Sequence, residues 1–118
     1  MSIKKVLFTL FGIAALTFSA DAQSYGNATL DAPACITLNT DEPLVDNYEM
    51  SISALGFTTE EELTTWSGHY SNNLITLSGD FAAGKAFVQL HNERLSEAKD
   101  IIWWNSYLGD LCTYYLEN

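Results

Sequence analysis

Positive charge is the scarcest property of this 118-residue chain. It has 5 Lys and Arg residues against 15 Asp and Glu residues, which gives a formal net charge of −10. Proteins that bind DNA or RNA need clustered Lys and Arg side chains at the phosphates, and proteins that dock on an anionic membrane surface need the same. The composition therefore argues against nucleic-acid binding and against electrostatic attachment to a membrane.

Sequence motifs of common enzyme classes are also missing. The chain has no G-x-S-x-G nucleophile motif and no glycine-rich loop of the kinds that bind dinucleotides or phosphates. His69 and His91 are its only histidines, and metal or acid–base chemistry requires that they meet a carboxylate such as Glu93. We therefore expect a protein that acts by binding, without a cofactor and without catalytic activity.

The beginning of the chain predicts export. Two lysines precede a mostly apolar run over residues 6–18, which is shorter than the ~20 residues of a membrane-spanning helix. Ala20 and Ala22 then form a small-x-small cleavage site, so residues 1–22 are predicted to be a bacterial signal peptide. We expect a protein that is secreted to the periplasm or the extracellular space and that has no membrane contact after cleavage.

Cysteine is rare, and its two copies predict a single disulfide bond. Cys35 and Cys112 both lie beyond the predicted signal peptide, and an exported chain meets an oxidising compartment. In the chain-entropy model, closing so long a loop stabilises a domain by about 4 kcal/mol. The alternative is a pair of metal-binding thiolates, although the separation of the two cysteines resembles no metal-ligand spacing.

Apolar and polar side chains alternate along several stretches, which is typical of half-buried strands. The alternation is cleanest where Tyr48, Met50 and Ile52 follow one another at every second position. The strands predicted in this way cover residues 48–55, 73–78, 85–91 and 111–116, and a short β-prone run covers residues 35–38. Residues 23–33 are polar and turn-rich, so we expect them to be loosely ordered.

Two helices are predicted between these strands. They cover residues 58–70 and 96–108. Thr58 and Glu61 form a capping-box pattern at the start of the first helix, while Ser96 is the expected N-cap of the second and Gly109 the residue that follows it. The order β-α-β-β-α-β is that of the ferredoxin-like split unit, an α+β fold with an antiparallel four-stranded sheet and both helices on one face.

This topology gives the predicted disulfide an architectural role. The last strand of a ferredoxin-like sheet lies at an edge, and Cys112 lies in that strand. We expect the bond to hold residues 35–38 against this edge, either as a fifth strand or as a covering segment. Beyond the signal peptide, the chain then divides into an N-terminal extension over residues 23–46 and a ferredoxin-like domain over residues 47–118.

Three stretches match the pattern of a known family. They are residues 52–57 (ISALGF), residues 84–88 (GKAFV) and the second helix up to Gly109. Over residues 48–109 the chain resembles a degenerate heavy-metal-associated domain of the copper-chaperone type, which implies the ferredoxin-like scaffold. The family's two metal-binding cysteines fall at Thr59 and Glu62, so the resemblance implies the scaffold without tight Cu(I) binding.

Aromatic side chains are the main candidates for a binding site. If Trp104 faces the core, Trp103 lies on the flank of the predicted helix beside Lys99 and Tyr107. An exposed pair of Trp103 and Tyr107 is the kind of anchor that a protein or a carbohydrate partner uses. The alternative is that residues 23–40 fold over Trp103 and bury it.

The sequence thus predicts a small exported acidic binding module whose partner is an unidentified protein or carbohydrate. Two alternatives stay open. One is a metal-handling periplasmic protein that uses carboxylate and histidine ligands, and the other is a small hydrolase whose residues meet only in the folded structure. A site that joins a histidine to a carboxylate would favour the hydrolase.

Overall fold

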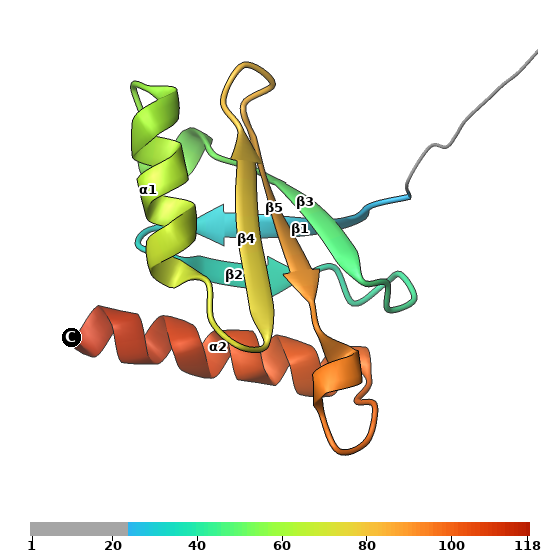
Figure 1. Ribbon diagram of the computed structural model, residues 1–118. Helices are drawn as coiled ribbons and strands as arrows, with labels where there is room; N and C mark the ends of the chain where they lie inside the picture. Colours follow the sequence, from blue (N-terminus) through green and yellow to red (C-terminus); the bar gives the residue numbers. More distant parts are fainter. Residues whose placement is uncertain (1–23) are drawn as a thin grey trace, which may run out of the picture.

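A five-stranded sheet and two helices build this protein (Figure 1). The computed structural model describes residues 24–118, so the predicted signal peptide lies outside the described part. The strands are β1 (Gly26–Asp31), β2 (Cys35–Leu38), β3 (Asn47–Ser51), β4 (Ile75–Asp80) and β5 (Lys85–Leu90). The helices are α1 (Glu60–Tyr70) and α2 (Ile101–Glu117), with short 3-10 turns at η2 (Ser53–Leu55) and η3 (Asn92–Arg94). The predicted α+β class is confirmed.

The order of the strands differs from the predicted one. Across the sheet it is β2-β1-β3-β5-β4, and β1 and β3 are the one parallel pair within the described sheet. Strands β3, β5 and β4 lie beside one another as a ferredoxin-like sheet requires. The place of the fourth strand, beside β3, is taken instead by β1, which pairs there at Gly26 with Tyr48 and at Asn27 with Glu49. The exact ferredoxin-like order is therefore not confirmed.

The predicted strand over residues 111–116 is wrong, because α2 continues through it to Glu117. Trp104 and Leu108 are buried, and Leu111 and Tyr115 pack against the same core at the next helical positions. This apolar stripe outweighs the local β-propensity of the tyrosines. It also carries the helix past Gly109, which is an exposed interior position of α2 and does not terminate it.

The start of α2 also differs from the prediction. The N-cap is Asp100, whose side chain accepts a hydrogen bond of 2.9 Å from the backbone N–H of Trp103. Ser96, the predicted cap, lies in the connection between η3 and α2. Asn92 holds this connection by bonding both the N–H and the carbonyl of Lys99. The helix therefore begins later than its apolar pattern suggests, since the connection has its own hydrogen bonds.

The segment predicted to be loosely ordered forms most of a β-hairpin. Strand β1 pairs with β2 in antiparallel register from Ala28 with Leu38 to Asp31 with Cys35. Leu30 is buried in the core, and Gly26 lies against the ring of Tyr48. The strand was not predicted because the segment is polar and turn-rich, and because β1 presents only small and aliphatic residues to the core.

Helix α2 lies along the outer edge of β2 (Figure 1). The Leu38 N–H donates a bond of 2.9 Å to the Asn105 side chain, and the predicted disulfide joins Cys35 to Cys112 with a Cα–Cα distance of 4.6 Å. The three-residue step from Cys35 to Leu38 along the strand and the seven-residue step from Asn105 to Cys112 along the helix both span ~10 Å. The hydrogen bond and the disulfide can therefore form at the same time. The disulfide is confirmed, but the edge it protects is that of β2, and the covering element is a helix.

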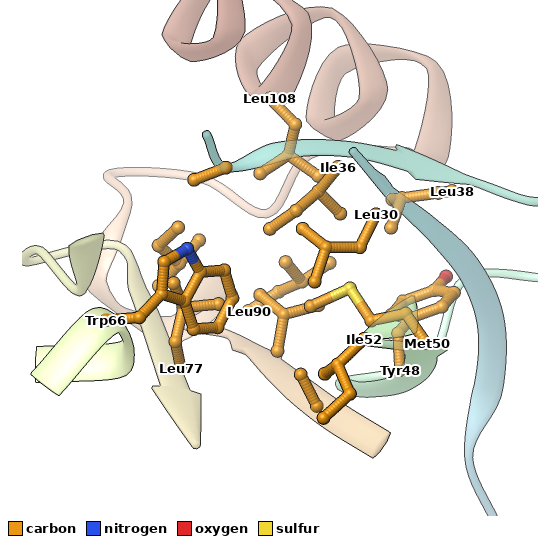
Figure 2. Close-up of a cluster of buried hydrophobic side chains, with 14 of the residues drawn as sticks. Leu30, Ile36, Leu38, Tyr48, Met50, Ile52, Trp66, Leu77, Leu90 and Leu108 are labelled. Carbon is orange, nitrogen blue, oxygen red and sulfur yellow. The ribbon is translucent and has the colours of Figure 1, made fainter. Parts of the chain in front are cut away.

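The hydrophobic core lies on one face of the sheet. Tyr48 is fully buried, and its hydroxyl accepts a bond from the Val45 N–H. Trp66 of α1 donates from its indole to the carbonyl of Pro33, which ties α1 to the β1–β2 turn. Figure 2 shows Leu108 reaching from α2 into the same cluster. Both helices thus contribute to one continuous core.

Removal of the disulfide is expected to destabilise the protein strongly. Cys35 and Cys112 are 77 positions apart, so loss of the bond returns about 4 kcal/mol of loop entropy to the unfolded chain. We expect the Cys35→Ser/Cys112→Ser double variant to melt far below the oxidised protein, as measured by circular dichroism. Two reactive thiols in the wild-type protein purified under oxidising conditions, or an unchanged melting temperature, would contradict this.

Two Gly→Ala substitutions are expected to have opposite effects. A Cβ on Gly79 would lie 2.5 Å from the buried side chain of Leu63, so Gly79→Ala is expected to cost about 1–3 kcal/mol. Gly109 is a helix-interior position where an added Cβ would meet no side chain and no other element within 4 Å, so Gly109→Ala is expected to add about 0.5–1 kcal/mol. Urea unfolding measures the free energy of unfolding of both variants. Equal changes would contradict the close contact between Gly79 and Leu63.

Candidate functional site

The predicted anchor residues form a stacked pair on the flank of α2. The rings of Trp103 and Tyr107 are nearly parallel, with centroids 5.5 Å apart, and both side chains are half-buried. Lys99 lies over the Trp103 ring, and the Tyr107 hydroxyl accepts a bond from Asn72. Trp103 is thus neither a fully exposed anchor nor a buried residue, and both rings already have partners within the chain.

A larger aromatic surface lies across α1 and the C-terminal end of α2. It contains two hollows, of about 600 and 360 Å³, which share His69 and Tyr70. The larger is lined by Thr59, Glu61, Glu62, Thr65, Trp66, His69 and Tyr70, and the smaller by His69, Tyr70, Tyr114, Tyr115 and Asn118. We call these residues together the aromatic groove.

Ring contacts make the floor of the aromatic groove continuous. The ring centroids of Trp66 and Tyr70 are 6.1 Å apart, and those of Tyr70 and Tyr115 are 4.8 Å apart. The ring of Tyr114 then lies 5.9 Å from that of Tyr115. The contact between Tyr70 and Tyr115 joins two helices that are far apart in the sequence, where the end of α1 meets the C-terminal half of α2 (Figure 1). Figure 2 shows that Trp66 also belongs to the core, so the groove has a rigid base.

The first turn of α1 places acidic groups at one end of the groove. The N-cap is Thr59, one residue later than predicted, and it accepts a bond from the Glu62 N–H. Glu62 reaches back, and its Oε1 accepts bonds from the N–H and the hydroxyl of Thr58. The bond from the Thr58 N–H, and to a smaller extent the bond from the Thr58 hydroxyl, lowers the pKa of the Glu62 carboxyl. The two positions that the family resemblance aligns with metal ligands therefore serve as helix caps.

The charge of the groove is negative. Glu61 and Glu62 line the larger hollow, and no Lys or Arg lines either hollow. The cations of the described chain have other partners: Lys85 pairs with Glu49, Arg94 bonds the carbonyl of Asn73, and Lys99 lies over Trp103. The carboxylates of the groove thus have no neutralising partner within residues 24–118.

A second polar cluster surrounds His91 at the end of β5. The Nε2 atom of this buried side chain lies 2.7 Å from the Thr76 hydroxyl, and its Nδ1 atom lies 3.1 Å from Glu93. Arg94 lies 3.8 Å from the same carboxylate. The pKa of Glu93 is lowered, first by its own backbone N–H and then by His91 and Arg94. The structure thus joins His91 to the carboxylate named from the sequence, while His69 lies in the aromatic groove.

Sequence patterns indicated only part of these sites. The sequence predicts that Trp66 and Tyr70 lie in the first helix, and it places Tyr114 and Tyr115 in a strand. The i, i+4 spacing of Trp66 and Tyr70 was a usable signal. No sequence pattern predicted that these two rings contact tyrosines of α2, because residues 111–116 were predicted to be a strand.

Residues 24–118 contain neither a cluster of metal ligands nor a membrane-spanning helix. Within residues 24–118, no group of three or more His, Cys, Asp or Glu side chains is placed to hold a metal ion. None of the helices in this part of the chain has the length and apolarity that a membrane crossing requires. Comparison of the chain with protein-family models, with curated proteins and with solved structures finds no match.

Acidification is expected to weaken the cap of α1. Because the pKa of Glu62 is lowered in the folded chain, its stabilising effect is complete above the pKa of the unfolded chain and is lost as the pH falls through the lowered value. The melting temperature of Glu62→Gln is therefore expected to fall less than that of the wild type between about pH 5 and pH 2. Glu60→Gln is the control, because it removes a charge from the same turn and leaves the bonds to Thr58 intact. Equal acid sensitivity of the two variants would contradict this prediction.

Proposed function

We propose that this protein is an exported binding module whose aromatic groove receives a cationic segment of a partner protein. The observation that carries the proposal is the continuous row of Trp66, Tyr70, Tyr115 and Tyr114 beside uncompensated carboxylates. This function involves no catalysis. The aromatic floor and the carboxylates act on the ligand by contact and by charge alone.

The aromatic floor suits cationic side chains. Arg and Lys groups bind over the faces of Trp and Tyr rings, and the planar guanidinium of Arg also stacks on them. Tyr70 is half-buried and Tyr114 is exposed, so the groove offers ring surface while its base stays fixed in the core. A fixed base lowers the entropy that binding must overcome.

Charge complementarity supports a cationic occupant over a neutral one. Glu61 and Glu62 lie at the end of the groove, and the net charge of −10 adds a long-range attraction for a basic partner. Aromatic residues and carboxylates also occur in carbohydrate sites, so an oligosaccharide is the competing ligand in the test below. The Cys35–Cys112 disulfide supports the export that this function assumes.

Removal of a groove ring is expected to weaken binding of a cationic peptide. The probe is a synthetic peptide of alternating Arg and Leu, and the measurement is isothermal titration calorimetry with the oxidised protein. Tyr70→Ala and Tyr115→Ala are expected to weaken binding about tenfold, because each removes a ring face that a guanidinium contacts. Glu61→Gln is expected to weaken it less, and by a smaller factor at high salt.

Matched controls separate the groove from other surfaces. Trp103→Ala removes the predicted flank anchor and is expected to leave affinity unchanged, as is Glu97→Gln, which removes an exposed charge outside the groove. A peptide with Glu in place of Arg is expected not to bind. Loss of binding in Trp103→Ala but not in Tyr70→Ala would move the site to the flank. Binding of a cello-oligosaccharide in place of the peptide would replace the proposed ligand.

A further inference from the structure

The hydrogen bonds around His91 have a direction that bears on reactivity. An ionised carboxylate only accepts hydrogen bonds, and Glu93 has a lowered pKa, so His91 donates to it from Nδ1. A neutral imidazole then carries its lone pair on Nε2. In this neutral tautomer Nε2, which lies 2.7 Å from the Thr76 hydroxyl, accepts a hydrogen bond from it. This is the arrangement of a hydroxyl nucleophile, a general base and an orienting carboxylate.

The accessibility of these groups fits the same roles. His91 is 5% exposed and both of its ring nitrogens are bonded, which holds the imidazole in one orientation. Thr76 is exposed on the sheet face opposite the core, where a reagent can reach its oxygen. Gln89 is also exposed and pairs directly with Thr76 across β4 and β5. Cross-strand neighbours lie close enough for the Gln89 amide to donate to the carbonyl oxygen of an ester that Thr76 attacks, where the oxyanion develops.

We infer that Thr76, His91 and Glu93 form an acyl-transfer site, separate from the binding function of the groove. Its substrates are small, activated carboxylic esters, because the reacting hydroxyl lies on an open sheet face. Thr76 and His91 contact the reacting atoms, and Glu93 is a positioning residue that holds the imidazole.

The reaction takes place in two steps. Oγ1 of Thr76 attacks the ester carbonyl carbon, and its proton passes to Nε2 of His91. The bond to the leaving alcohol breaks, the alcohol takes the proton from the imidazolium, and the acyl group stays on Thr76. A water molecule then gives a proton to His91 and attacks the acyl carbon. The carboxylic acid leaves, and Thr76 recovers its proton from the imidazolium.

Reaction with p-nitrophenyl acetate tests this assignment on the oxidised protein. We expect a burst of p-nitrophenolate with a stoichiometry near one per chain, and peptide mass spectrometry is expected to find the acetyl group on Thr76. The burst rate is expected to rise with pH, because general-base catalysis requires the unprotonated base. Thr76→Val is expected to abolish the burst, and Thr76→Ser to accelerate it severalfold because its hydroxyl is less hindered.

Further variants separate reactivity from a structural role of the cluster. Glu93→Gln, at an exposed position, is expected to slow the burst about tenfold or more while the protein stays folded. Ser78→Ala removes another exposed hydroxyl of β4 and is expected to change nothing. Absence of a burst in the wild type, or acetylation confined to lysines and the amino terminus, would overturn the proposal. So would a Thr76→Val variant that melts normally and keeps the wild-type burst.

Discussion

The attachment of α2 to the edge of β2 is the contact on which most of this architecture depends. A disulfide at Cys112 and a backbone-to-side-chain bond at Asn105 hold the helix at two points along the strand. Together they cover an edge that would otherwise expose unpaired backbone groups to pairing with other chains. They also set the direction of α2, so that its last turns approach the end of α1.

That approach creates the aromatic groove. Tyr115 meets Tyr70 because α2 runs antiparallel to β2, which brings the C-terminal turns of α2 to the end of α1. The acidic first turn of α1 lies at the other end of the same groove. Its carboxylates repel one another, but the helix N-terminus and the bonds from Thr58 offset this cost locally. Negative charge can therefore accumulate beside apolar rings without loss of the helix.

The cluster around His91 arises from strand register. Thr76 pairs with Gln89, and His91 directly follows the last residue of β5, where its Nε2 atom lies 2.7 Å from the Thr76 hydroxyl. The turn at η3 then brings Glu93 back to the imidazole. The β4–β5 pairing thus brings the Thr76 hydroxyl beside the imidazole of His91, while a local turn supplies the carboxylate. The groove and this cluster are built from different elements, the helices α1 and α2 for the groove and β4, β5 and η3 for the cluster.

The sequence by itself determined what is encoded over a few residues or by elimination. Two cysteines allow one pairing, and the alternation around Tyr48 and Val88 identifies β3 and β5.

The tertiary structure decided the rest. Residues 111–116 have β-propensity, but Leu111 and Tyr115 pack against the core at helical spacing after Trp104 and Leu108. β1 became a strand because β2 and β3 offered it backbone partners on both sides. The aromatic groove and the bonds of His91 join residues from separate elements, and local patterns do not contain that information, since such contacts depend on how the elements pack.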